Sequence, residues 1–118
     1  MSTSWHSYPK IWALGHRAVR ELFDGDVFVE EKVDGSQFSF GVFNDELRCR
    51  SKGADINTQA PEKMFAKAVE TAQRLGPDLL EGATYRGEYL QKPKHNTLAY
   101  DRVPEGNIII FDINTAEE

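Results

Sequence analysis

The feature that most constrains the fold is the alternation of apolar and polar residues over Ser36–Phe43. Every second residue from Phe38 onward is apolar, which is the period of a strand with one buried face. Asn44-Asp45 follows directly and favours the tight turn of a hairpin, which leads into a second strand over residues 47–51. The chain is therefore predicted to build an antiparallel sheet around this hairpin.

One long helix is predicted for residues 61–75. Apolar residues recur there at helical spacing, Pro61 suits the first turn, and Gly76 suits a left-handed cap. Strands that dominate around a single long helix indicate the α+β class with antiparallel sheets. The remaining predicted elements are strands over residues 27–32, 84–90 and 107–113, and a short helix over residues 16–23.

The chain has 118 residues, enough for one domain with a core but not for two, so residues 1–118 are predicted to form a single domain. Because the sequence stops soon after the strand expected at 107–113, we expect this domain to be truncated. No apolar run approaches the roughly 18 residues of a membrane span, and the N-terminus lacks a signal-peptide pattern. The single cysteine, Cys49, fits a reducing compartment. We predict a cytoplasmic protein with no membrane partner.

The net charge of −5 argues against a protein that binds nucleic acid mainly through phosphate contacts, since such proteins are usually basic. Two stretches, residues 48–52 and 92–95, are locally basic although the chain as a whole is acidic. From composition alone, phosphate contacts and ordinary solvated loops are equally good interpretations of both stretches.

Residues 30–35 read Glu-Glu-Lys-Val-Asp-Gly and place Lys32 at a strand end, beside carboxylates and before a glycine turn. Taken alone, the pattern also fits a charged strand edge followed by a hairpin turn. A lysine attacks only as the free amine, and its ordinary pKa of ~10.4 keeps it protonated unless burial, a cation or a metal intervenes. Nearby carboxylates favour the charged form. They suit a nucleophilic lysine if they hold a divalent metal or orient the ammonium group.

Two later strands carry acidic residues. Residues 85–89 read Tyr-Arg-Gly-Glu-Tyr, which places Glu88 within a strand. The apolar strand at residues 108–113 is interrupted by Asp112. An aspartate in such a strand is costly to bury unless it is paired or binds a ligand.

In this order the segments resemble the motifs of the covalent nucleotidyltransferases, the superfamily of ATP-dependent DNA ligases, RNA ligases and mRNA capping enzymes. Residues 31–35 look like the first motif, whose lysine takes up the nucleotide, and residues 50–53 look like the short basic motif that follows. Residues 85–88 resemble the third motif and residues 110–113 the next one. The stretch 92–97 and the small size look most like RNA ligases of the phage type.

The resemblance implies a partial ATP-grasp-like nucleotidyltransferase domain with Lys32 as the catalytic residue. It implies that Glu88 takes the ribose hydroxyls and that the ring of Phe111 stacks on the purine. Further implied contacts are Glu31 and Arg50 on the nucleotide, and Lys52, Lys92 and Lys94 on a phosphate or RNA end.

The resemblance also implies a reaction. Lys32 would be adenylylated by ATP, the AMP would pass to the 5′-phosphate of an RNA end, and a 3′-hydroxyl would then join the strands, as in RNA repair. Magnesium is implied because the leaving pyrophosphate carries charge. The family's later glutamate-glycine strand and lysine-x-lysine strand have no counterpart before Glu118, so the chain looks like a front half only.

Other functions remain open at this point. A non-catalytic short form could bind nucleotide or RNA without forming the adduct, and a DNA ligase or capping enzyme would share the same motifs. The three histidines show no metal-ligand spacing, so no protein metal site is predicted from them. Cys49 is predicted to be a small strand residue, and Trp5 and Trp12 are predicted to pack.

Overall fold

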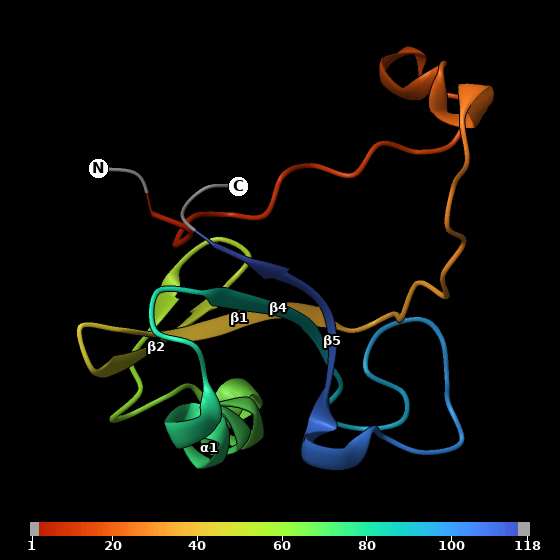
Figure 1. Ribbon diagram of the computed structural model, residues 1–118. Helices are drawn as coiled ribbons and strands as arrows, with labels where there is room; N and C mark the ends of the chain where they lie inside the picture. The colour runs from red at the N-terminus through yellow and green to blue at the C-terminus, as the bar shows by residue number, and fades with distance from the viewer. Residues whose placement is uncertain (1–2, 116–118) are drawn as a thin grey trace.

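The computed structural model describes residues 3–115, which are built around a five-stranded antiparallel sheet in the order β3-β2-β1-β4-β5. One α-helix, α1 (Ala66–Leu75), lies on one side of this sheet (Figure 1). The predicted α+β class is therefore confirmed. The strands are β1 (Ser36–Phe43), β2 (Glu46–Ser51), β3 (Asp55–Ile56), β4 (Thr84–Tyr89) and β5 (Ile108–Asn114). Short 3-10 turns are η1 (Arg17–Val19), η2 (Leu22–Asp24), η3 (Lys63–Phe65), η4 (Gly76–Asp78) and η5 (Glu105–Asn107).

The hairpin β1–β2 forms as predicted. Asn44 and Asp45 adopt positive φ angles of 54° and 64°, the conformation that a two-residue turn needs to match the twist of its strands. Phe43 and Glu46 then pair across the turn, and β1 pairs with β4 on its other side. The first residue of β1, Ser36, pairs with Tyr89 at the end of β4. The chain that enters β1 therefore lies next to the end of β4.

The apolar face of the sheet is covered by α1. Phe38 and Phe40 on β1 are both 0 % exposed and belong to the core cluster, as the period-two pattern predicts. Ser39 between them is also buried, at 2 % exposed, so β1 is covered on both faces and not on one as predicted. Cys49 lies on β2, 1 % exposed, which confirms the prediction of a strand residue. The helix contributes Ala68, Val69 and Ala72 to the same cluster, which also includes Tyr89.

The N-terminal segment crosses the opposite face of the sheet (Figure 1). Ser4 donates through its Oγ to the carbonyl of Gly82 at 2.9 Å and shares a 2.8 Å hydrogen bond with Thr84. Trp5 is 9 % exposed and contacts Phe43 edge-on at 5.3 Å between ring centroids, which confirms its predicted packing role. Trp12 does not join the core as predicted, since it is 40 % exposed and its ring stacks on His16.

Two predicted elements do not form. Residues 27–32 were predicted to be a strand but are extended chain outside the sheet, with Phe28 97 % and Val29 91 % exposed. A strand exists only when its backbone groups pair with a neighbour, and sequence alternation does not supply the neighbour. The helix predicted at residues 16–23 is replaced by η1 and η2, which bury no residue.

The long helix is shorter than predicted. Residues 63–65 form η3, and the α-helical part is the ten residues of α1. Gly76 does not form the left-handed cap, since its φ of −43° and ψ of −49° carry the chain onward into η4. None of the helices between residues 3 and 115 is long and apolar enough to cross a bilayer.

Candidate functional site

Three charged groups meet where the chain enters β1. Lys32 is exposed in the extended segment before the strand, and Asp34 follows two residues later. Glu88 on β4 pairs with Gln37 on β1, so the sheet brings this carboxyl to the same place. Burial raises the pKa of Glu88, the positive charge of Lys32 lowers it, and the negative charge of Asp34 raises it further. The charges of Lys32 and Asp34 therefore act on Glu88, which faces the start of β1 through its pairing with Gln37.

Asp34 is held by the loop of residues 91–100. Its Oδ2 accepts hydrogen bonds from the backbone N–H groups of Thr97 and Leu98, both at 2.8 Å. These two bonds are the main reason why the pKa of Asp34 is lowered. The backbone N–H of Asp34 donates to the Tyr100 hydroxyl at 2.8 Å, and Asn96 donates to the carbonyl of Gly35 at 2.7 Å. The turn after Lys32 is therefore bound from outside the sheet.

The same loop is anchored to the sheet by His95. Its Nε2 lies 2.7 Å from the Oγ of Ser36 on β1, and its Nδ1 lies 3.0 Å from the backbone nitrogen of Gln91. The imidazole also contacts the Tyr89 ring edge-on, with 5.6 Å between centroids. Loop and sheet therefore enclose this half-buried histidine from several sides.

Lys92 and Lys94 project from this loop as exposed side chains. The loop doubles back around them, since the Tyr100 N–H donates to the carbonyl of Pro93 at 2.9 Å and Lys94 forms a bridge with Ala99. Both ammonium groups are therefore carried by the loop that binds Asp34. Glu31 is exposed in the extended segment beside Lys32.

Arg50 and Lys52 lie on and after β2, on the side of the sheet crossed by the N-terminal segment. Arg50 donates to the Ser7 hydroxyl at 2.9 Å, and its guanidinium lies 5.9 Å from the centre of the Trp5 ring. Ser7 in turn donates to the carbonyl of Lys52 at 3.3 Å. Ser7 and Trp5 of the N-terminal segment therefore contact the guanidinium that is predicted to bind nucleotide.

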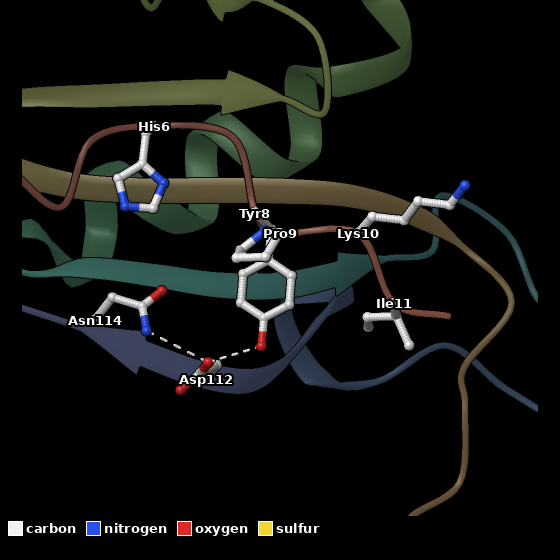
Figure 2. Close-up of a pocket in the computed structure, with 7 residues that line it drawn as sticks. All are labelled: His6, Tyr8, Pro9, Lys10, Ile11, Asp112 and Asn114. Carbon is white, nitrogen blue, oxygen red and sulfur yellow. Dashed lines mark hydrogen bonds between the residues drawn. The ribbon is translucent and has the colours of Figure 1, made fainter. Parts of the chain in front are cut away.

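Phe111 on β5 is also in contact with the N-terminal segment. Tyr8 meets the Phe111 ring edge-on at 5.3 Å and donates to Oδ2 of Asp112 at 2.8 Å. Beside this contact lies an open cavity of about 310 Å³, lined by residues 6 and 8–11 and by the end of β5. Figure 2 shows Tyr8 and Asn114 converging on Asp112 at its rim. Asp112 is thus half-buried and paired, as the cost of burying a lone carboxylate requires.

The RNA ligase family matches residues 25–118, which is most of the chain. The chain belongs to the RNA ligase family. The match is consistent with the N-terminal part of an RNA ligase nucleotidyltransferase domain and confirms the predicted family resemblance. No curated protein and no solved structure matches the chain.

In this RNA ligase chain the predicted site residues separate into two groups. Lys32 and Glu88 come together at the start of β1, with Asp34 between strand and loop. Arg50 and Phe111 instead contact the N-terminal segment, which lies outside the matched residues.

One residue that sequence reasoning missed is Arg86. It is 0 % exposed, and its guanidinium donates to the carbonyls of Ser4 and His6 and to the side chain of Asn114. Burial lowers the pKa of Arg86, as does the charge of Arg50 nearby. The only signal in the sequence was an arginine inside a strand pattern, two residues before Glu88.

Metal binding by the protein alone is not supported by the described side chains. Between residues 3 and 115, no three His, Cys, Asp or Glu side chains gather in a group that could hold an ion. Magnesium usually takes one or two carboxylates and completes its shell with water and substrate phosphates. Among the carboxylates near Lys32, Asp34 already accepts two backbone hydrogen bonds, whereas Glu31 is exposed to solvent.

Proposed function

We propose that this chain is the front part of the adenylyltransferase domain of an ATP-dependent RNA ligase, with Lys32 as the residue that takes up AMP. The observation that carries the proposal is the RNA ligase family match over residues 25–118, in a fold that places Lys32 and Asp34 just before β1 and Glu88 opposite Gln37 on β4. An ATP-grasp-like architecture, a single domain over residues 1–118 and a cytoplasmic location belong to the same proposal.

In the proposed reaction, the free amine of Lys32 attacks the α-phosphorus of ATP. A P–N bond forms, the P–O bond to pyrophosphate breaks, and the proton of the ammonium group leaves before the attack. Exposure of Lys32 to solvent gives this proton a route out and leaves space for the nucleotide. Bound with ATP, magnesium would supply charge neutralisation for the departing pyrophosphate.

Glu88 is proposed to accept hydrogen bonds from the ribose hydroxyls, because it is half-buried on β4 beside Lys32. Glu31 is proposed to lie on the adenine or metal side. The exposed ammonium groups of Lys92 and Lys94 are proposed to contact a phosphate or RNA end, with Lys52 as a further contact. AMP would then pass from Lys32 to an RNA 5′-phosphate, and a 3′-hydroxyl would complete the joining.

A second candidate function is a binding module that holds nucleotide or RNA without forming the adduct. The observation that favours it is that no lysine-x-lysine strand follows Phe111 in this sequence, while Arg50 and Phe111 are engaged with Ser7 and Tyr8 and not free for the nucleotide. The contacts of Arg50 and Phe111 with the N-terminal segment would have to break before these two residues could bind a nucleotide as predicted. Tight RNA binding that is unchanged in a Lys32→Ala variant would support this candidate.

The test is intact mass spectrometry under non-acidic conditions after incubation with ATP and magnesium. We expect the wild-type chain to gain one AMP and the Lys32→Ala variant to gain none. Lys67→Ala is the matched control, since Lys67 is an exposed lysine on α1 and not on the chain that enters β1. An adduct that persists in Lys32→Ala would rule out Lys32 as the acceptor, and parallel joining assays on RNA and DNA would separate an RNA ligase from a DNA ligase.

A further inference from the structure

The loop of residues 91–100 has no role in the proposed chemistry beyond its two lysines, yet it is bound tightly to the turn after Lys32. Its backbone donates to the Asp34 carboxylate from Thr97 and from Leu98. Backbone N–H groups of a loop hold a carboxylate in a set direction only if the loop itself is held. The position of Asp34, and with it the backbone two residues after Lys32, therefore depends on what anchors the loop.

His95 anchors the loop to β1, while Asn96 and Tyr100 bond directly to the turn at Asp34 and Gly35. The backbone N–H of Gln91 can only donate, so Nδ1 of His95 must be the acceptor in their 3.0 Å contact. The ring proton of the neutral imidazole then sits on Nε2, which donates to the Oγ of Ser36 at 2.7 Å. One ring thus connects the start of the loop to β1, two residues after Asp34, while its edge contact with Tyr89 orients it.

We propose that His95 is a positioning residue for Lys32, which acts through loop 91–100 and Asp34 without touching the nucleotide. The inference rests on the proposed function, in which Lys32 attacks ATP. The turn after Lys32 is held in two ways: it continues directly into β1, and its Asp34 side chain is bound by the loop. Loss of the His95 anchor frees the loop, and the amine then spends less time in line with the α-phosphorus.

The test compares two substitutions that separate hydrogen bonding from packing. His95→Phe keeps an aromatic ring against Tyr89 but removes both hydrogen bonds. His95→Asn shortens the side chain but keeps an acceptor for the Gln91 N–H. His16→Phe is the matched control, because His16 is exposed and stacks on Trp12 far from the loop in sequence.

The rate of AMP adduct formation is measured as a function of ATP concentration for each variant. We expect His95→Phe to lower the rate at saturating ATP by about 10-fold to 100-fold, with little change in the ATP concentration that gives half of the maximal rate. His95→Asn should recover part of the rate, and His16→Phe should match wild type. Hydrogen exchange at the Thr97 and Leu98 N–H groups should be faster in His95→Phe than in wild type.

Each result decides the question. A His95→Phe rate at saturating ATP equal to that of wild type, or equal losses in the Phe and Asn variants, would overturn the positioning role and leave Lys32 as the acceptor. A wild-type chain that forms no adduct would overturn AMP uptake by this chain, and the positioning role with it, and would favour the non-catalytic binding module. The two failures are therefore distinguished by the wild-type measurement alone.

Discussion

A single arginine shows how far a residue's setting can depart from its sequence context. Arg86 lies between Tyr85 and Gly87 in a segment where Glu88 is the residue with an expected chemical role. In the fold, Arg86 is fully enclosed and donates to the carbonyls of Ser4 and His6, about 80 positions away along the chain. Its charge is tolerated there because planar N–H donors match several acceptors at once.

Replacement of Arg86 should therefore destabilise the chain. Arg86→Ala leaves the two N-terminal carbonyls and the Asn114 side chain without this donor, and we expect a loss of about 3 kcal/mol in the free energy of unfolding. Arg86→Lys keeps the charge but not the fork of donors, so it should recover only part of the loss. Urea unfolding measures both, and the exposed Arg17→Ala serves as control. An Arg86→Ala variant as stable as Arg17→Ala would contradict this account.

At the scale of elements, local pattern predicted the strands that have a neighbour and failed for the segment that has none. The turn at Asn44-Asp45 brings β1 and β2 together by itself, so the alternation over Ser36–Phe43 was sufficient. Residues 27–32 show a comparable apolar run but lie outside the sheet. The helix was predicted to begin at residue 61, but residues 63–65 form the 3-10 turn η3 and α1 begins only at Ala66.

The junction between Lys32 and β1 depends on a glycine. A Cβ at Gly35 would overlap the backbone carbonyl of Tyr89 on β4 and press on the Leu90 side chain. We expect Gly35→Ala to cost about 1–3 kcal/mol in the free energy of unfolding, because β1 and β4 must separate to admit the methyl group.

Gly53→Ala is the control for that measurement. Nothing lies within 4 Å of a Cβ at Gly53. The free energy of unfolding of Gly53→Ala should therefore stay within about 0.5 kcal/mol of that of wild type. Thermal or urea unfolding of both variants makes the comparison. Equal stability of the two alanine variants would show that β1 and β4 are packed less closely than the structure has them.

At the scale of the whole molecule, the sheet separates two kinds of surface. One face holds the apolar cluster under α1, and the other holds charged and polar side chains under the N-terminal segment. Tyr8 connects this segment to β5 across 104 positions of sequence through its bond to Asp112. Apolar side chains remain exposed along β5, where Ile109, Ile110 and Ile113 are 40 %, 43 % and 48 % exposed. An exposed apolar edge strand of this kind favours self-association.

The Tyr8 contact predicts how stability falls at alkaline pH. Burial first, and then the hydrogen bond to Asp112, raise the pKa of Tyr8. Because the pKa of Tyr8 is higher in the folded state, its contribution to the free energy of unfolding is complete below the unfolded-state pKa of about 10. That contribution is lost as the pH rises through the folded-state pKa. We therefore expect the melting temperature to drop above about pH 10.

Tyr8→Phe removes the titrating group and should flatten that drop, at a cost of about 1 kcal/mol at neutral pH for the lost hydrogen bond. Some slope should remain, because burial also raises the pKa of Tyr89. Melting curves between about pH 8 and pH 11 make the measurement. An unchanged slope in Tyr8→Phe would show that the N-terminal segment does not hold Tyr8 in this setting.

The sequence by itself determined the α+β class, the β1–β2 hairpin and the apolar face of the sheet, because each follows from turn chemistry or from periodicity within a few neighbouring residues. It also identified Lys32 and Glu88 as residues of interest through their motifs, although not their proximity. Only the tertiary structure decided that His95 anchors the loop that binds Asp34, that Arg86 holds the N-terminus, and that Arg50 and Phe111 contact the chain's own N-terminal segment. The physical reason is the same in each case: the partners lie tens of residues apart, and hydrogen-bond geometry between them exists only once the sheet has brought them together.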